Sequence, residues 1–95
     1  MVCSVGGYAS DMSRNFTFGP SSADQAELHA IAERAFEDGR AALIPGTTLA
    51  HVHRVTTDSL ARQGLRSFRR GHFGHSVGQS VFSEQWPFIA ADSDV

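Results

Sequence analysis

Residues 21–64 read SSADQAELHAIAERAFEDGRAALIPGTTLAHVHRVTTDSLARQG, and this stretch decides the fold class. Ser22 and Gln25 have the spacing of a capping box, in which each side chain accepts from the other residue's backbone N–H at a helix start. The pattern of small and apolar residues then predicts one helix face of four turns or more, which Pro45 and Gly46 end. That face consists of Leu28, Ile31, Ala32, Ala35, Phe36, Gly39, Ala42 and Leu43.

The same stretch predicts a second helix, for which Thr47 or Thr48 can supply the N-cap. Gly64 is the residue type that commonly follows a helix C-terminus, so we expect the helix to end close to it. The short Pro-Gly link predicts that the two helices are neighbours. The apolar face of the second helix is Leu49, Val52, Thr56 and Leu60.

Outward from the helices, the N-terminal segment holds two runs of strand-forming residues, 2–9 and 12–18. Phenylalanines alternate with polar residues in the second run, as in a half-buried strand. Gly6 and Gly7 predict a turn or bulge between or within the runs. Beyond Gly64 the chain is rich in glycine and aromatic residues, which suits strands and close-packed loops.

The predicted order of elements is strand, strand, helix, helix, then strand or loop, which defines an α+β fold. One hairpin and two amphipathic helices leave a sheet face and a sheet edge uncovered. We therefore expect residues 1–95 to form part of a larger domain.

Composition sets limits on partners and location. The formal net charge is −2, with eight Arg and no Lys, so we expect no nucleic-acid partner and no anionic membrane surface. No apolar run approaches the roughly 20 residues of a membrane span, and a cytoplasmic location is the default expectation. The lone Cys3 excludes an internal disulfide and is expected to be a buried or half-buried structural thiol.

Asp11 is the first candidate for chemistry. It lies in the sequence GYASDMSRNF, residues 7–16, where strand propensity disfavours an aspartate. An edge position, a salt bridge with Arg14, or a metal ion would each explain it, and the residues alone leave these alternatives open.

The second candidate is the segment HFGHSVG, residues 72–78. Its glycines let backbone and ligand approach closely beside His75, although a packed core or loop histidine is the alternative. His72 and His75 have the spacing of a metal pair, but they match no closed zinc site, and in a regular strand they would point to opposite faces. The other three histidines fall on the predicted helices, where we expect solvated or partly buried roles: His29, His51 and His53.

Taken in order, these segments resemble the pita-bread metallohydrolases, which include methionine aminopeptidase, Xaa-Pro aminopeptidase, prolidase and creatinase. The resemblance rests on GYASDMSRNF, on two helices separated by PGTT, on FGHSVGQSVF and on WPFI, and it covers nearly the whole chain. In that family a Gly-Tyr-x-x-Asp-x-x-Arg-x-Phe strand supplies a metal-bridging aspartate, and Gly-His-x-x-Gly supplies the single histidine ligand. The corresponding residues here are Asp11 and His75, and residues 1–95 would be part of a pita-bread catalytic domain.

The resemblance implies a site in which two aspartates, one histidine and two glutamates hold two divalent ions and a bridging water. Carboxylate-rich ligation with one imidazole suits Mn²⁺, Co²⁺, Zn²⁺ or Fe²⁺. The implied reaction is hydrolysis of an amide bond in a peptide or small-amide substrate. A homodimer of the complete protein is left open.

The chain also departs from the family pattern. The first aspartate would precede Met1 and the two glutamates would follow Val95, so we expect the remaining ligands to lie outside this chain and these 95 residues alone to be inactive. Phe82 stands where a second histidine usually follows. His72 is the candidate catalytic residue to replace it, and Glu84 could contribute.

Two alternatives stay open. Ser76, in place of a commoner glycine, fits a small-amide hydrolase of the creatinase or ectoine-hydrolase type. Loss of ligands would instead fit a non-catalytic binding module. For the metal site itself, we expect Asp11 on the second strand of an N-terminal hairpin, with its carboxylate within about 10 Å of the His75 ring, because the two ions of such a site lie roughly 4 Å apart.

Overall fold

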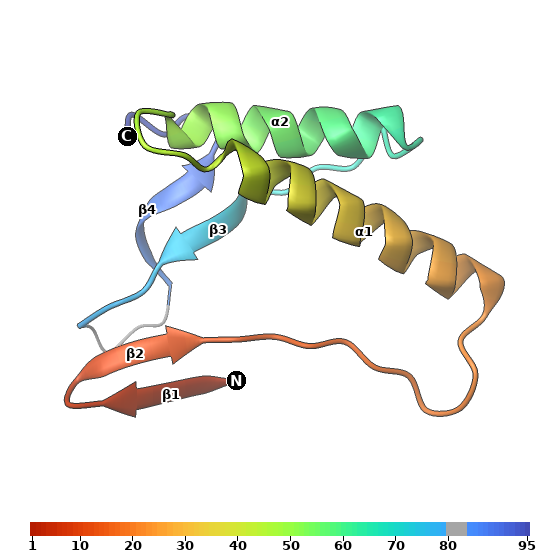
Figure 1. The fold of residues 1–95 in the computed structure, drawn as a ribbon, viewed down its shortest axis with the longest axis horizontal. Helices are drawn as coiled ribbons and strands as arrows, with labels where there is room; N and C mark the ends of the chain where they lie inside the picture. Colours follow the sequence, from red (N-terminus) through yellow and green to blue (C-terminus); the bar gives the residue numbers. More distant parts are fainter. Residues whose placement is uncertain (80–83) are drawn as a thin grey trace.

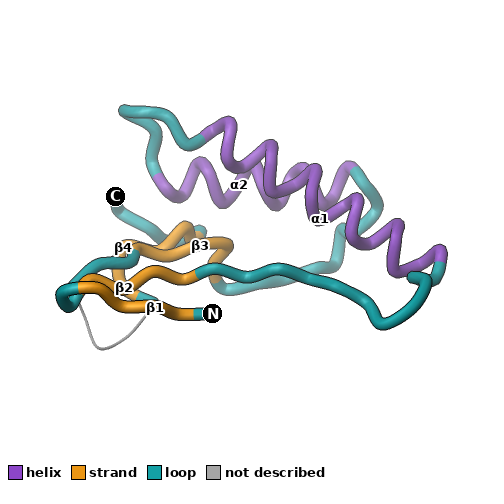
Figure 2. The backbone as a smooth tube through the Cα atoms, turned by 60° about the horizontal axis from the view of Figure 1, so that its bottom comes forward, coloured by secondary structure: helices purple, strands orange, loops and turns teal. Residues whose placement is uncertain are grey.

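The structure, a computed structural model, describes residues 1–79 and 84–95 and confirms the α+β prediction (Figure 1). Within these residues the elements follow in the order β1 (Val2–Val5), β2 (Tyr8–Asp11), α1 (Ala23–Ala42), α2 (Leu49–Arg62), β3 (His72–Ser76) and β4 (Gln85–Ala90). The described strands form two antiparallel pairs, β1–β2 and β3–β4. The helices lie side by side in one layer, α2 packs against β3 and β4, and the N-terminal hairpin lies beyond that sheet (Figure 2). The sequence predicted one strand or loop after the helices, whereas the structure has two strands there, β3 and β4.

The N-terminal hairpin turns within the first predicted run. Gly6 and Gly7 have φ of 58° and 85°, which fits a two-residue type I′ turn, a conformation that glycine adopts without strain. The register pairs Val2 with Asp11. Cys3 is exposed, so the expected buried thiol is wrong: a two-stranded hairpin has nothing covering either face of this strand.

The strand predicted for residues 12–18 is also wrong, because no strand in the described part of the chain pairs with this segment. The backbone of Met12 still bonds to Met1, with the Met1 amino group 2.7 Å from the Met12 carbonyl oxygen. Beyond Met12 the segment continues as a long connection to α1 (Figure 1). The alternating phenylalanines are exposed on this connection.

Helix α1 begins with the predicted capping box. The Gln25 backbone N–H donates to Ser22 Oγ at 3.2 Å, and the Ser22 backbone N–H donates to Gln25 Oε1 at 2.9 Å. Two N–H groups that the helix itself cannot satisfy are thereby paired.

Replacement of Ser22 by alanine is expected to lower the free energy of unfolding by about 1 kcal/mol, because one cap acceptor is lost. Chemical denaturation of the 95-residue chain measures this change. Ser21→Ala is the matched control, since no hydrogen bond of the Ser21 side chain is present among the described residues. Equal losses in both variants would contradict the cap assignment.

Helix α2 begins at the second of its two candidate caps. The His51 backbone N–H donates to Thr48 Oγ1 at 3.2 Å. The helix ends in a Schellman motif, in which Gly64 has φ of 102° and the Leu65 backbone N–H donates to the Leu60 carbonyl at 2.9 Å. Both ends agree with the sequence prediction.

The helices meet closely at Gly39 and Thr56. A β-carbon built on Gly39 would lie 2.4 Å from Thr56 Oγ1, so only glycine allows this separation between the helices. Val52 and Ala35 are 2% and 3% exposed and form the centre of this contact. A polar link adds to it, because Ser59 Oγ donates to the Asp38 carboxylate.

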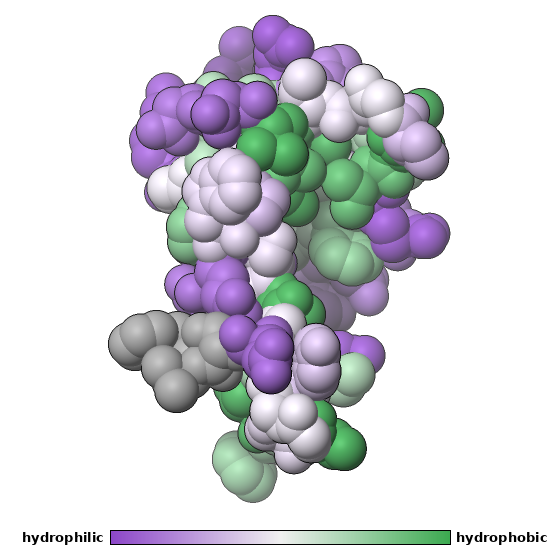
Figure 3. All heavy atoms as spheres, turned by 90° about the vertical axis from the view of Figure 1, so that its left-hand side faces the viewer, coloured by the Kyte–Doolittle hydropathy of each residue, from purple (hydrophilic) through white to green (hydrophobic). Residues whose placement is uncertain are grey.

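The rest of the apolar surface is poorly covered. Phe36, on the predicted helix face, is 65% exposed, and Leu43 is 52% exposed. Figure 3 shows hydrophobic side chains exposed both around the helices and at the far end over the N-terminal hairpin. A two-helix, two-hairpin arrangement buries few large side chains. In the described part of the chain, neither helix is long and apolar enough to span a membrane.

Candidate metal-binding site

The two hairpins are joined at the end of β3. The Ala9 backbone N–H donates to the Gly78 carbonyl at 2.9 Å, and Tyr8 forms an isolated β-bridge with Gln79. These contacts tie β2 to the residues that follow β3. The last residue of β2, Asp11, is thereby brought to His75, which lies 64 positions later in the sequence.

Asp11 and His75 face each other directly. Asp11 Oδ2 lies 3.3 Å from His75 Nε2, and the two side chains are 26% and 16% exposed. This separation is well inside the limit expected from the sequence. The salt bridge considered with Arg14 is not formed, because the Arg14 guanidinium donates to the Ser13 carbonyl instead. Asp11 does occupy a strand of the N-terminal hairpin, as predicted.

The protonation pattern of this pair is informative. His75 Nδ1 lies 3.0 Å from the backbone carbonyl oxygen of Ser76, and a carbonyl oxygen only accepts hydrogen bonds. Nδ1 therefore carries the hydrogen, and in the neutral ring the lone pair of Nε2 points at Asp11. An ionised carboxylate is also an acceptor, so the two atoms repel each other unless a proton or a cation lies between them.

The donor set fits a divalent ion in type and in spacing. Two ligand atoms that each lie about 2.1 Å from one ion, at an angle near tetrahedral or octahedral, are roughly 3.0–3.4 Å apart. A histidine that binds metal through one nitrogen usually donates from the other to a carbonyl or carboxylate, and His75 Nδ1 has such a partner in the Ser76 carbonyl. Within residues 1–79 and 84–95, no group of three or more His, Cys, Asp or Glu side chains gathers at one point. The described chain thus offers one carboxylate and one imidazole.

His72 lies beside this pair, contrary to the prediction that the two histidines point to opposite faces. Its ring centroid is 6.1 Å from that of His75, at an interplanar angle of 83°. The reason is that the β3–β4 register shifts between His72 and His75 and again before Ser76, and such irregularities redirect side chains. His72 also stacks against Phe88, with ring centroids 4.9 Å apart.

Glu84, the residue just before β4, completes the described surroundings of His72. Its Oε2 lies 3.6 Å from His72 Nε2. Phe82, which stands in the place of the family's second histidine, lies outside the described residues. The Ser76 carbonyl is the feature that sequence reasoning missed, because a backbone acceptor leaves no residue signal.

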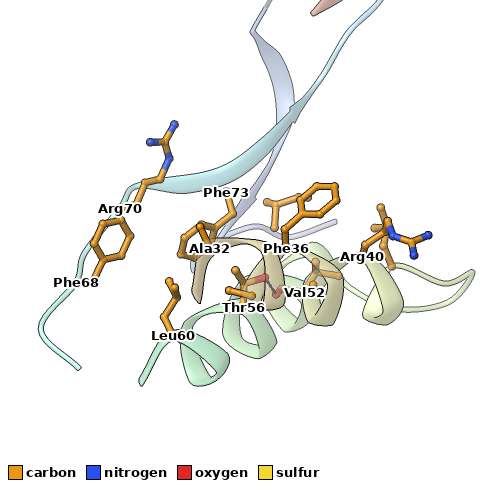
Figure 4. Close-up of a pocket in the computed structure, with 13 residues that line it drawn as sticks. Ala32, Phe36, Arg40, Val52, Thr56, Leu60, Phe68, Arg70 and Phe73 are labelled. Carbon is orange, nitrogen blue, oxygen red and sulfur yellow. Dashed lines mark hydrogen bonds between the residues drawn. The ribbon is translucent and has the colours of Figure 1, made fainter. Parts of the chain in front are cut away.

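An apolar groove lies elsewhere, between the helix layer and the other face of β3–β4. It has a volume of about 450 Å³ and is lined mainly by apolar side chains, including Phe36, Leu60 and Phe73 (Figure 4). Arg40 and Arg70 are its charged residues, and no carboxylate or imidazole lines it. This groove therefore lacks the acid–base groups that the Asp11–His75 site has.

Comparison with known proteins adds independent information. The family model described as "Metallopeptidase family M24" matches residues 1–95. The chain is 33% identical over 89 residues to a probable dipeptidase PepE of Mycobacterium tuberculosis, and equally to that of Mycobacterium bovis. It is 29% identical over 89 residues to an Xaa-Pro dipeptidase of Lactobacillus helveticus.

These matches cover 94% of the chain but only 23–24% of each relative, so the chain spans about a quarter of their length. No solved structure matches significantly.

Proposed function

The chain belongs to metallopeptidase family M24, and from that premise we propose that it contributes two metal ligands to a hydrolase of the Xaa-Pro aminopeptidase or prolidase type. The observation that carries the proposal is the contact between Asp11 Oδ2 and His75 Nε2. With the hydrogen on Nδ1, the facing Nε2 and Oδ2 atoms are compatible only with a proton or a cation between them, and the family membership favours the metal ion.

Each residue has a proposed task. Asp11 binds through its carboxylate, His75 binds through Nε2, and the Ser76 carbonyl keeps the ring in the tautomer that leaves Nε2 free. Divalent ions, two of Mn²⁺, Co²⁺, Zn²⁺ or Fe²⁺ in a complete site, would supply an activated water and polarise the scissile amide. His72 is the proposed catalytic residue, whose ring N–H donates to the oxygen of that amide.

Peptides are the proposed substrates. The relatives named dipeptidase and Xaa-Pro dipeptidase support a short peptide over a small non-peptide amide. A domain that includes these 95 residues would need further carboxylate ligands, because one carboxylate and one imidazole leave most coordination positions to water. A cytoplasmic location and a homodimer of the complete protein remain predictions.

Paramagnetic broadening by Mn²⁺ tests the ligand assignment on this chain. In an isotope-labelled sample, substoichiometric Mn²⁺ is expected to broaden the signals around Asp11 and His75 first, because both bind one ion. Zn²⁺, added in excess, should restore them. Broadening centred on another carboxylate, such as Asp38 in the helix contact, would show that the site is elsewhere.

A dipeptide assay tests the expected incompleteness. With Mn²⁺ or Co²⁺ present, we expect the 95-residue chain to bind metal weakly and to cleave no Xaa-Pro dipeptide above background, because two ligands do not form a catalytic site. Calorimetry and product detection measure both properties. Micromolar or tighter binding with turnover would mean that the chain supplies further ligands, and Glu84 and His72 would be the first to replace.

A further inference from the structure

We infer that Glu84 is a positioning residue for His72, holding its ring proton on Nε2 and its ring beside His75. The inference rests on the proposed function only for the role given to His72 in the reaction. It concerns the residue just before β4, whose described ion pair is with His72 and not with the Asp11–His75 pair.

Packing already fixes the plane of the His72 ring. His72 is paired with Ala90 across the sheet, stacks on Phe88 at 4.9 Å and meets His75 edge-on at 6.1 Å. Its side chain is 27% exposed. What packing does not decide is which nitrogen carries the proton, since the ring can rotate or change tautomer without losing these contacts.

The polar surroundings of His72 determine which ring nitrogen carries the proton. His72 Nδ1 is buried and has no hydrogen-bond partner among the described residues, so a hydrogen there would be an unsatisfied buried donor. Nε2 faces Glu84 Oε2 at 3.6 Å, and a carboxylate accepts hydrogen bonds. The neutral ring therefore carries its hydrogen on Nε2. His75, by contrast, carries its hydrogen on Nδ1 because of the Ser76 carbonyl.

Opposite tautomers give the two histidines different chemistry. His75 presents a lone pair and is suited to bind a cation, whereas His72 presents an N–H and is suited to donate to a substrate oxygen. The distance between His72 Nε2 and Glu84 Oε2 exceeds a normal hydrogen-bond length. The carboxylate therefore orients the N–H without forming a full hydrogen bond to it. A donor oriented before substrate arrives needs less reorganisation when charge develops.

The chain contains a matched control for this contact. His29 Nε2 and Glu33 Oε1 are also 3.6 Å apart, but they lie on the surface of α1 with side chains 56% and 71% exposed. Glu84 is itself 57% exposed, so the difference lies in the imidazole: the His29 ring is open to water, and this pair should fix neither tautomer nor orientation. The comparison separates the effect of the site from that of any His–Glu pair.

The test is NMR of the 95-residue chain with ¹⁵N-labelled histidine, at about pH 8.5, where an ordinary imidazole is neutral. His72→Gln and His75→Gln assign the ring signals. We expect a protected ring N–H on Nε2 of His72 and on Nδ1 of His75. Glu84→Ala should speed solvent exchange of the His72 ring proton at least tenfold and leave that of His75 unchanged.

Glu84→Gln should retain the His72 signal, because its amide oxygen still accepts. Glu33→Ala should change nothing at His29. A hydrogen on Nδ1 of His72 in the unmodified chain, or an unchanged His72 signal in Glu84→Ala, would overturn the inference. These measurements use no metal. Failure of Mn²⁺ to bind near Asp11 would therefore contradict the proposed function without affecting the inference about Glu84 and His72.

Discussion

His75→Ala and Asp11→Asn are each expected to lower the affinity of this site for Mn²⁺ or Co²⁺ by at least about 100-fold, since loss of an outer-shell partner alone typically costs 10- to 100-fold. Each variant removes one of the two described ligands. In a complete domain the same changes should abolish metal-dependent hydrolysis. Mn²⁺ broadening measures the loss in the 95-residue chain.

A second prediction for Asp11→Asn concerns the thermal stability of the metal-free chain. In the metal-free chain its amide N–H₂ can donate to the lone pair of His75 Nε2, which replaces an acceptor–acceptor contact by a hydrogen bond. Its thermal unfolding midpoint should therefore equal or exceed that of the unmodified chain. A structural ion pair would behave in the opposite way, because removing one partner leaves the other unpaired.

Two exposed helix residues supply matched controls. His51→Ala and Asp58→Asn repeat the same chemical changes at exposed positions of α2 and should leave Mn²⁺ broadening unchanged. If Asp11→Asn or His75→Ala also leaves it unchanged, the ligand assignment is wrong.

The helices could be predicted from the sequence because their signals are local. The Ser22–Gln25 box and the glycine at residue 64 act within one turn of the backbone they satisfy, and both are found where expected. The strand predicted for residues 12–18 failed for the opposite reason. Strand pairing depends on a distant partner, and among the described residues no strand pairs with this segment.

The candidate site was predictable only in part. Asp11 and His75 were identified through the family resemblance, since nothing local in either segment indicates that they meet. Their contact depends on the bond between Ala9 and Gly78, which joins two hairpins far apart in sequence. The face of the sheet on which His72 lies depends on a register shift between β3 and β4. The alternation of side chains along a regular strand cannot reveal such an irregularity from sequence.

Gly39→Ala is expected to lower the free energy of unfolding by about 2 kcal/mol, because Gly39 is in close contact with Thr56. Overpacking typically costs about 1–3 kcal/mol. The higher helix propensity of alanine offsets at most about 1 kcal/mol of this cost. The new β-carbon would lie 2.4 Å from Thr56 Oγ1. That hydroxyl cannot move freely, because it is buried and donates to the Val52 carbonyl at 3.0 Å. The helices must therefore separate, and the central Val52 contact loosens.

A double-mutant cycle identifies the cause. Thr56→Ala removes Oγ1, and the nearest remaining atom, the residue 56 β-carbon, would lie at an ordinary 3.6 Å from the new methyl group. Gly39→Ala should then cost less in the Thr56→Ala background than alone, with a coupling energy above about 0.5 kcal/mol, as expected for residues in contact. Gly71→Ala is the control, because its β-carbon meets open space. Additive losses at residues 39 and 56 in chemical denaturation would show that the helices adjust without a clash, and that glycine is not what sets their separation.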